Sequence, residues 1–287
     1  MANLDWEGPA IAGKELKGPL GWVEAATPEG CGHPVGWFDE VWVHGMRLPR
    51  VWGACRMALR AGKRLVRMTH GSLSPIYLTQ QSPMKKKLVS PIERYFLRRA
   101  DKVVATCEAE AEWIRSYLGR RCPPIVLTDI KRFFKLNNPN LVNPVNPVKK
   151  DLHLLYLGRR HPLKGLEFLE AAVKGIEGVE LRVVSNAFGD EKERVWKWCD
   201  VLVLPTLSDN FGLVIAEALE RGKRVITTDG APAWGEELTG LTGFTGLYSG
   251  YEGRLIYLKG YRDGTDEERV ELLKKAIDML KHDGNMV

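Results

Sequence analysis

The alternation of short apolar runs with helical segments constrains the fold of this chain more than any other feature. Before residue 130, strands are predicted at 38–45, 64–71, 102–107 and 124–127, and helices at 51–62, 91–99 and 108–118. After residue 150, strands are predicted at 152–158, 179–185, 200–205 and 223–229, and helices at 164–173, 212–221 and from 265 to about 284. Strands that alternate with helices indicate an α/β protein with parallel sheets.

The rhythm is interrupted at residues 137–150, which read NNPNLVNPVNPVKK. The three Asn-Pro pairs in this stretch exclude a central strand or helix, because proline lacks the backbone N–H that either structure needs. We therefore predict two domains, at 1–140 and 141–287, joined by an extended linker at about 137–150. A length of 287 residues is ample for two domains of ordinary size.

Composition limits where the protein works and what it meets. No run approaches the roughly 18 apolar residues that span a bilayer, and the N-terminal segment lacks the pattern of a signal peptide, so the expected location is the cytoplasm. The five cysteines form no C-x-x-C pair, which indicates reduced thiols rather than a disulfide framework or zinc site. A net charge of +6 is compatible with an anionic partner or simply with surplus surface lysine.

Two cations follow the strand predicted at 152–158, in the sequence LYLGRRHPLKG. Arg159 and Lys164 flank a short loop between this strand and the next helix. At the carboxyl end of a strand, such a pair can clamp a diphosphate, with arginine acting through its planar fork and lysine as a point charge. The alternative is a pair of solvated charges on a connecting loop.

The segment 201–217 reads VLVLPTLSDNFGLVIAE and contains two carboxylates eight positions apart, Asp209 and Glu217. A buried strand ends here at a polar loop, and a helix begins at 211–212. The N–H groups of a helix N-terminus attract anions, and carboxylates beside them suit the hydroxyl groups of a ribose or a sugar. The alternative makes Asp209 an N-cap and Glu217 a solvated helix residue.

Two His-Gly pairs end strands in the first half of the chain. His70 follows the run RLVRMT, and His44 has the same local form after FDEVWV. A histidine at a strand end can act on a reacting sugar, although a lone histidine is more often structural. His44 therefore competes with His70 for this role.

The segment 85–102 is strongly basic. Ser90 and Glu93 form a predicted capping box with Pro91 at the first helical position, and the helix carries Ile92, Tyr95 and Phe96 as an apolar stripe. Its cations include Arg94, Arg98, Arg99 and Lys102. They predict either a surface helix packed on its sheet or a contact with anionic lipid headgroups or a phosphorylated acceptor.

Taken together, these motifs resemble the retaining glycosyltransferases of the GT-B fold, family 4, also called glycosyl transferases group 1. GRRHPLKG looks like the family's G-R-x-x-x-x-K-G phosphate motif, CDVLVLPTLSDNFGLVIAEAL like its E-x7-E segment, and RVITTDGAP like the strand and turn that follow. MTHGSLSPIYL and RRADKVVATCEAEAEWI resemble its acceptor-side domain more weakly. The likeness covers residues 38–240 and comes closest to bacterial enzymes that build lipopolysaccharide and other surface glycans.

The resemblance implies a fold of two Rossmann-like domains and a role for each matching residue. The donor diphosphate would be held by Arg159 and Lys164, and by the backbone of Phe211, Gly212 and Leu213. The family retains anomeric configuration without a metal or other cofactor, so the cations and the helix N-terminus would stabilise the leaving diphosphate.

The same resemblance implies three catalytic residues, His70, Asp209 and Glu217. His70 would lie near the anomeric carbon on the acceptor side, and Glu217 would accept hydrogen bonds from the ribose. Asp209, with Asn210, would contact hydroxyls of the transferred sugar. Asp209 stands where the family usually has glutamate, so its side chain is one methylene shorter.

The expected partners are a nucleotide sugar, a glycan or lipid-linked acceptor, and an anionic membrane surface on the cytoplasmic side that contacts 85–102. The N-terminal domain is expected to be shortened, because GPAIAGKELKGPLG does not align with the family's Gly-rich loop. The shorter Asp209 and this short domain leave open a non-catalytic nucleotide-sugar-binding protein, or a nucleotide-sugar epimerase of the same fold. A nucleic-acid partner is not expected, since the chain has no helix-turn-helix, zinc finger or aromatic RNA-binding signature.

Overall fold

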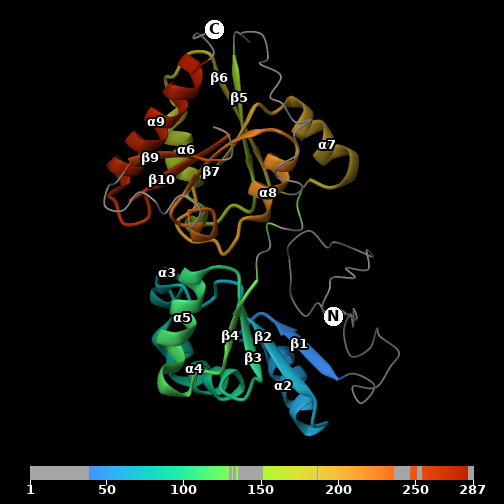
Figure 1. Cartoon of the computed structure of the whole chain (residues 1–287). Helices are drawn as coiled ribbons and strands as arrows, with labels where there is room; N and C mark the ends of the chain where they lie inside the picture. Colours follow the sequence, from blue (N-terminus) through green and yellow to red (C-terminus); the bar gives the residue numbers. More distant parts are fainter. Residues whose placement is uncertain are drawn as a thin grey trace. The chain divides into compact units, whose positions relative to one another are not determined.

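The computed structural model forms two compact units, Met1–Thr128 and Asp129–Val287 (Figure 1). It describes residues 39–128, 131, 134, 151–185, 187–235, 246–250 and 254–283. The predicted linker at 137–150 and the first 35 residues, including the segment compared with the Gly-rich loop, lie outside the described residues. The boundary between the two units lies between residues 128 and 129, whereas the sequence analysis placed it between residues 140 and 141.

In the described part of unit 1, the sheet contains four parallel strands whose spatial order follows the chain, β1-β2-β3-β4. The strands are β1 (Glu40–His44), β2 (Arg64–Met68), β3 (Lys102–Ala105) and β4 (Ile125–Leu127). The helices are α2 (Pro49–Arg60), α3 (Pro75–Thr79), α4 (Pro83–Leu97) and α5 (Glu108–Leu118), followed by the 3-10 turn η2 (Gly119–Arg121). The predicted strands are confirmed, and α3 was not predicted.

Three helices of unit 1 share one apolar core against the sheet. Ala54 of α2, Leu97 of α4 and Ile114 of α5 pack in one cluster with Leu65 and Val103 from the strands. These side chains are almost fully removed from water, so the cluster supplies most of the hydrophobic stabilisation of unit 1. Packing against the three helices therefore fixes the sheet. It also fixes the points from which the loops at the carboxyl ends of the strands begin.

The helix predicted to begin at Ser90 begins instead at Pro83, and Pro91 lies inside it. The predicted capping box is therefore wrong, because Glu93 is buried and faces the core rather than the backbone N–H of Ser90. Glu93 Oε1 accepts a hydrogen bond from Arg67 at 2.7 Å, and its Oε2 accepts one from Trp52 Nε1 at 2.8 Å. The helix thus places Glu93 against the buried guanidinium of Arg67, although Pro91 lacks the backbone N–H that a helix interior uses.

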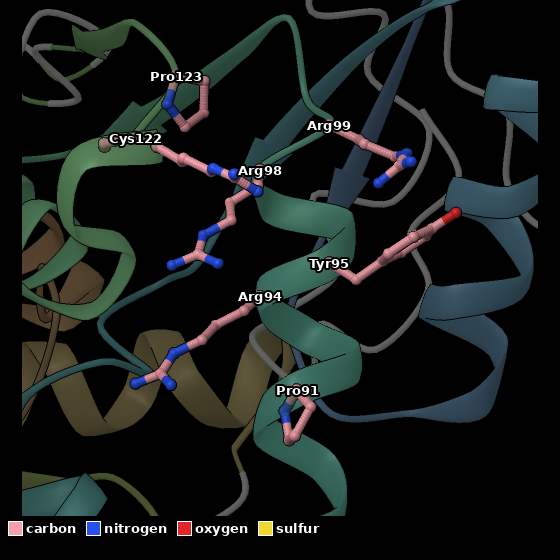
Figure 2. A pocket seen from close by; sticks show the side chains of 8 residues that line it. Pro91, Arg94, Tyr95, Arg98, Arg99, Cys122 and Pro123 are labelled. Atoms are coloured by element: carbon pink, nitrogen blue, oxygen red, sulfur yellow. The ribbon is translucent and has the colours of Figure 1, made fainter.

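The predicted apolar stripe on α4 is also divided by the structure. Phe96 is buried, whereas Ile92 and Tyr95 are exposed. On the outer side, Figure 2 shows Arg94 and Arg98 projecting in one direction and Tyr95 in another. The exposed surface of α4 therefore carries both charged and aromatic side chains.

Among the residues of unit 2 that the structure describes, the sheet contains six strands in the order β6-β5-β7-β8-β10-β9, all parallel except β9 against β10. The strands are β5 (Leu152–Leu157), β6 (Val179–Val184), β7 (Val201–Leu204), β8 (Arg224–Thr228), β9 (Gly246–Gly250) and β10 (Leu255–Lys259). The helices are α6 (Leu166–Val173), α7 (Gly189–Trp198), α8 (Leu213–Glu220) and α9 (Asp266–Asp283), with 3-10 turns η4 (Pro162–Lys164) and η5 (Pro232–Trp234). Sequence reasoning missed α7, β9 and β10.

Unit 2 is a doubly wound sheet. Helices α6 and α9 pack on one face, in a cluster with Leu154, Val201 and Ile226, and α7 and α8 lie on the other face (Figure 1). From β5 the chain passes to β6 on one side, and then to β7 on the other. The carboxyl ends of β5 and β7 therefore flank the point where the winding reverses, which is where open α/β sheets bind ligands.

Candidate active site

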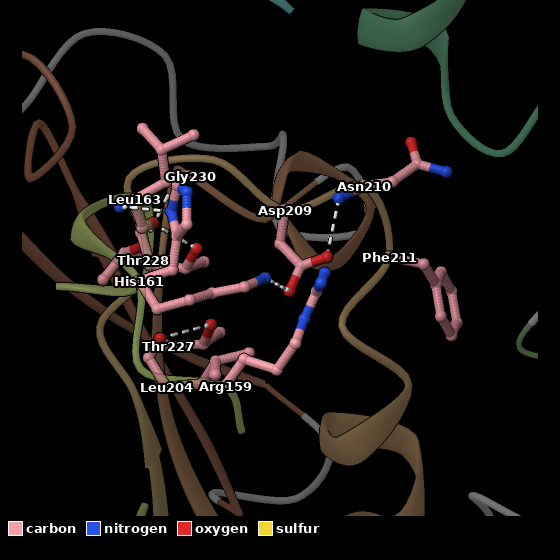
Figure 3. A network of polar contacts seen from close by, with 12 residues as sticks. Arg159, His161, Leu163, Leu204, Asp209, Asn210, Phe211, Thr227, Thr228 and Gly230 are labelled. Atoms are coloured by element: carbon pink, nitrogen blue, oxygen red, sulfur yellow. Dashed lines mark hydrogen bonds and ion pairs between the residues drawn. The ribbon is translucent and has the colours of Figure 1, made fainter. Parts of the chain in front are cut away.

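An ion pair joins the loops that follow β5 and β7. Lys164 Nζ lies 2.5 Å from Asp209 Oδ2, and each side chain is about one fifth exposed, at 19% and 22%. Figure 3 shows Arg159 extending toward the same carboxylate. The structure thus brings Arg159, Lys164 and Asp209 together at the switch point, as the sequence predicted. Their partial exposure leaves the pair accessible to a ligand.

The two loops are locked together by hydrogen bonds to the carbonyl of Leu163. Leu207 N donates to this carbonyl at 2.8 Å, and Thr206 Oγ1 donates to it at 2.9 Å. Gly165 adopts a positive φ of 62°, and a Cβ at this position would lie 2.1 Å from the carbonyl oxygen of Pro205. Only glycine fits this approach, so the contact between the loops fixes the position of Lys164.

Asp209 is held by its own backbone and by the turn after β8. Its N–H donates to the carbonyl of Gly230 at 2.8 Å, and its Oδ1 accepts from the N–H of Asn210 at 2.8 Å. The N-cap of α8 is Gly212, and no side chain caps the helix there. Asp209 is therefore not an N-cap, and its second oxygen is directed at Lys164 instead.

The start of α8 is shaped by Gly212 and by the burial of Phe211. Gly212 has a φ of 65°, and a Cβ on it would lie 2.9 Å from Ile215 Cδ1. The Phe211 ring is buried against Trp234, with ring centroids 5.1 Å apart, and its carbonyl accepts a hydrogen bond from Trp234 Nε1. With no side-chain cap, the N–H groups of Leu213 and its neighbours face out of the helix end.

Glu217 has a partner that the sequence did not reveal. Lys192 Nζ, on α7, lies 2.6 Å from Glu217 Oε2, and the two side chains are 19% and 17% exposed. Glu217 is therefore not a solvated helix residue. The acidic residues Asp190 and Glu191 in the first turn of α7 are a helix-start signal that could have revealed this element.

In unit 1, His44 and His70 form a pair at the carboxyl edge of the sheet. His44 Nδ1 and His70 Nε2 are 2.8 Å apart, and the rings stack with centroids separated by 5.1 Å. Burial, and then the neighbouring His70, lowers the pKa of His44 to about 3. Burial also lowers the pKa of His70, although the Glu110 carboxylate opposes the shift. The two histidines predicted as competitors are therefore partners, and both are neutral near pH 7.

A buried carboxylate holds the turn that carries His70. Glu110 of α5 accepts hydrogen bonds from Thr69 Oγ1 and from the N–H of Gly71, both at 2.7 Å. Its other oxygen accepts from the N–H and the hydroxyl of Thr106, both at 2.9 Å. His70 itself has a φ of 49°, a left-handed conformation that non-glycine residues seldom adopt. Sequence reasoning did not identify this role of Glu110.

Comparison with known families places both units. Residues 21–128 match the glycosyl transferase 4-like domain, and residues 137–246 match the glycosyl transferases group 1 family. Each unit therefore contains a segment that matches a glycosyltransferase family domain. Together with the parallel strands of both sheets, these matches confirm the predicted GT-B fold.

Solved structures of similar fold match most of this chain. Sucrose-phosphate synthase from Thermosynechococcus elongatus is 19% identical, with a TM-score of 0.57 over 87% of this chain and 66% of that one. HepE from Anabaena in complex with UDP-glucose is 17% identical, with a TM-score of 0.56 over 86% and 71%. The α,α-trehalose 6-phosphate synthase from Burkholderia multivorans is 12% identical, with a TM-score of 0.54 over 86% and 65%.

These glycosyltransferase-like structures show the fold alone, at identities this low. The present chain spans about two thirds of the length of the sucrose-phosphate synthase chain. No sequence among the curated proteins matches it. Within the described part of the chain, every helix is too short or too polar to cross a membrane.

Proposed function

We propose that this glycosyltransferase moves a sugar from a nucleotide-sugar donor to a hydroxyl of a glycan or lipid-linked acceptor, of the lipopolysaccharide or surface-polysaccharide type. The observation that carries the proposal is the Lys164–Asp209 pair at the switch point between β5 and β7. It sets a cation for the diphosphate beside a carboxylate for sugar hydroxyls. The UDP-glucose complex of HepE, which shares the fold, supports a donor of this class.

The ion pair suggests how donor binding begins. A diphosphate oxygen would replace Asp209 on Lys164, with Arg159 as the second cation and the N–H groups at 211–213 as neutral donors. Asp209, released from Lys164, would then accept a hydrogen bond from a hydroxyl of the transferred sugar, with Asn210 beside it. Glu217, with its partner Lys192, would contact the ribose.

In the proposed reaction, the acceptor oxygen forms a bond to the anomeric carbon while the bond from that carbon to the diphosphate oxygen breaks. The acceptor proton passes to the departing phosphate oxygen, so both events occur on one face of the sugar and the configuration is retained. Arg159, Lys164 and the start of α8 would stabilise the charge on the leaving group without a metal or other cofactor. His70, neutral and held by His44 and Glu110, would line the acceptor side.

We further propose that the enzyme works in the cytoplasm, at the inner face of the membrane, where a lipid-linked acceptor would be presented. The basic segment 85–102 supports this location through its cations and the exposed side of α4.

The donor site can be tested with thermal shift measurements on the purified protein against uridine, guanosine and adenosine diphosphates and their sugar conjugates. One base series should raise the melting temperature of the wild type, because a ligand that binds the folded state stabilises it. Lys164→Ala should abolish the shift. Lys174→Ala, which removes an exposed lysine of the same unit beyond the end of α6, should leave it unchanged. A chain that responds to no nucleotide would overturn the proposal.

A non-catalytic nucleotide-sugar-binding protein, or an epimerase of the same fold, is the second candidate. The shorter Asp209 in place of glutamate is the observation that favours it. Incubation with the stabilising nucleotide sugar and a panel of glycan acceptors separates the three cases by product. Transfer yields a longer glycan, epimerisation yields an isomeric nucleotide sugar, and a binding protein yields neither.

A further inference from the structure

A surface hollow on unit 1 lies away from the pair formed by His44 and His70. It has a volume of about 700 Å³ and is formed by the last turns of α4 and the loop between α5 and β4. Four arginines line it. Arg94 lies on α4, Arg98 and Arg99 lie in the turn directly after it (Figure 2), and Arg121 ends η2. These segments lead into the amino ends of β3 and β4, whereas the histidine pair lies at the carboxyl edge. The hollow is therefore separate from the histidine pair.

The charge of these arginines is not neutralised within the part of the chain that the structure describes. No ion pair with a described carboxylate involves any of the four, although ion pairs are formed by many other surface arginines of the protein. Arg98 donates instead to the carbonyl of Leu118 at 2.8 Å, and a neutral carbonyl leaves its positive charge in place. Such a concentration of like charge is unfavourable unless an anion offsets it.

Aromatic rings hold two of the guanidinium groups. Arg94 lies over the ring of Tyr117, 4.6 Å from its centroid, and Arg99 lies over the ring of Tyr95 at 4.0 Å. Cation–π contacts of this kind restrict the side chain but do not consume its N–H donors. The hollow therefore presents ordered, planar donors, which match the geometry of a phosphate group.

We propose that this arginine-lined hollow is a second anion site, which binds the phosphate group of a ligand independently of the donor site. Guanidinium groups bind phosphate through paired, charge-assisted hydrogen bonds, and several around one cavity suit a singly esterified phosphate. The proposal does not rest on the glycosyl transfer proposed above, because none of the four arginines belongs to the candidate active site.

The exposed side of α4 favours a lipid as the source of this phosphate. Met84, Leu88, Ile92 and Tyr95 are 69%, 61%, 39% and 49% exposed, and their spacing places them along one side of the helix. An exposed apolar stripe flanked by arginine is the pattern of a helix that lies in a membrane interface. A soluble phosphate ester offers the same chemistry to the hollow, and the experiment separates the two sources.

The test compares two double variants that remove the same charge from neighbouring helices. Arg94→Gln/Arg121→Gln alters the hollow, and Arg56→Gln/Arg60→Gln alters exposed residues of α2. All four side chains are exposed, so both variants should fold, which circular dichroism checks. In sedimentation with vesicles of phosphatidylcholine and phosphatidylglycerol, the first variant should bind on the order of thirtyfold more weakly than wild type. The control should change less than about twofold, and vesicles of phosphatidylcholine alone should bind neither protein.

A second arm uses glycerol 3-phosphate, titrated into the full chain by calorimetry. Binding that is lost in Arg94→Gln/Arg121→Gln, with no sedimentation on anionic vesicles, would assign the hollow to a soluble phosphate ester. Equal losses in the two double variants would show that general charge, not the hollow, attracts the anion, and would overturn the proposal. So would a wild type that binds neither the vesicles nor glycerol 3-phosphate.

Discussion

The buried carboxylates of unit 1 and the lysine-paired carboxylates of unit 2 differ in their exposure to water and in the partners that they bind. Glu93 and Glu110 are fully buried, and each accepts hydrogen bonds from both backbone and side-chain donors. Asp209 and Glu217 are partly exposed, and each pairs with one lysine. Glu110 holds the turn that carries His70, and Glu93 holds the backbone at Arg47. For Asp209 and Glu217, our proposal is that a ligand can replace the lysine. Burial thus separates carboxylates that build the structure from those that are available to bind.

The largest effect should come from removing the charge of Glu93. Glu93→Gln leaves Arg67 buried without a counter-charge, and the free energy of unfolding should fall by about 3–5 kcal/mol. Urea denaturation followed by circular dichroism measures the change. Glu112→Gln, at an exposed position of α5, is the control and should stay within about 0.5 kcal/mol of wild type. A Glu93→Gln protein as stable as this control would contradict the comparison.

The next effect concerns acid stability and His44. The folded-state pKa of His44 is lowered to about 3, below an unfolded value of about 6.5, so the unfolded chain binds the extra proton. The stability gained by keeping His44 neutral is therefore fully present above about pH 6.5 and is lost as the pH falls toward 3. Over this range the free energy of unfolding should fall by up to about 1.4 kcal/mol per pH unit. Unfolding free energies measured across this range should slope less in His44→Asn. Equal slopes in the two proteins would show that other groups dominate.

Asp209 allows the idea of an exchangeable pair to be tested directly. Removing its charge in Asp209→Asn frees Lys164, so the affinity for the free nucleoside diphosphate should rise several-fold, by about 1 kcal/mol or less. Sugar transfer by the same variant should fall, because the carboxylate no longer accepts a hydrogen bond from the sugar. Calorimetry and a transfer assay measure the two effects. Weaker nucleotide binding would mean that Asp209 supports the diphosphate site rather than competing for it.

The smallest effect is expected when glutamine replaces Glu217, as it replaces Glu93 in the first prediction. Glu217→Gln breaks the contact with Lys192, but both side chains can reach water, so the free energy of unfolding should change by less than about 1 kcal/mol. Urea denaturation alongside Glu93→Gln provides the matched comparison. A loss as large as that at position 93 would remove the distinction between the two kinds of carboxylate.

Sequence reasoning succeeded where the signal was local. The apolar runs at β2, β5 and β7 were placed to within a few residues, because a buried strand is a short, continuous pattern. The helix α7 was missed because most of its residues are charged, and only Trp196 is buried. The start of α4 was misplaced because Pro91 is typical of a first turn, and no local signal shows that Arg67 needs Glu93.

The contacts of the candidate site also divide into those that the sequence predicts and those that it does not. Arg159, Lys164 and Asp209 follow two strands that are neighbours in a parallel sheet, so their meeting could be predicted from the order of the motifs. The contacts of Glu110 with the His70 turn, and of Lys192 with Glu217, join elements 25 or more positions apart. Such pairings depend on how helices dock on the sheet, which one segment of sequence does not encode.

The order of the strands has a consequence for how each unit assembles during synthesis. In unit 1 the spatial order equals the chain order, so each strand that leaves the ribosome can add to an edge that already exists. In unit 2, β5 gains its second neighbour only after β6 and α7 have been made, because β7 pairs on its far side. The surfaces that form the candidate donor site are therefore completed late, and the N-terminal unit can fold before the nascent chain has finished its second sheet.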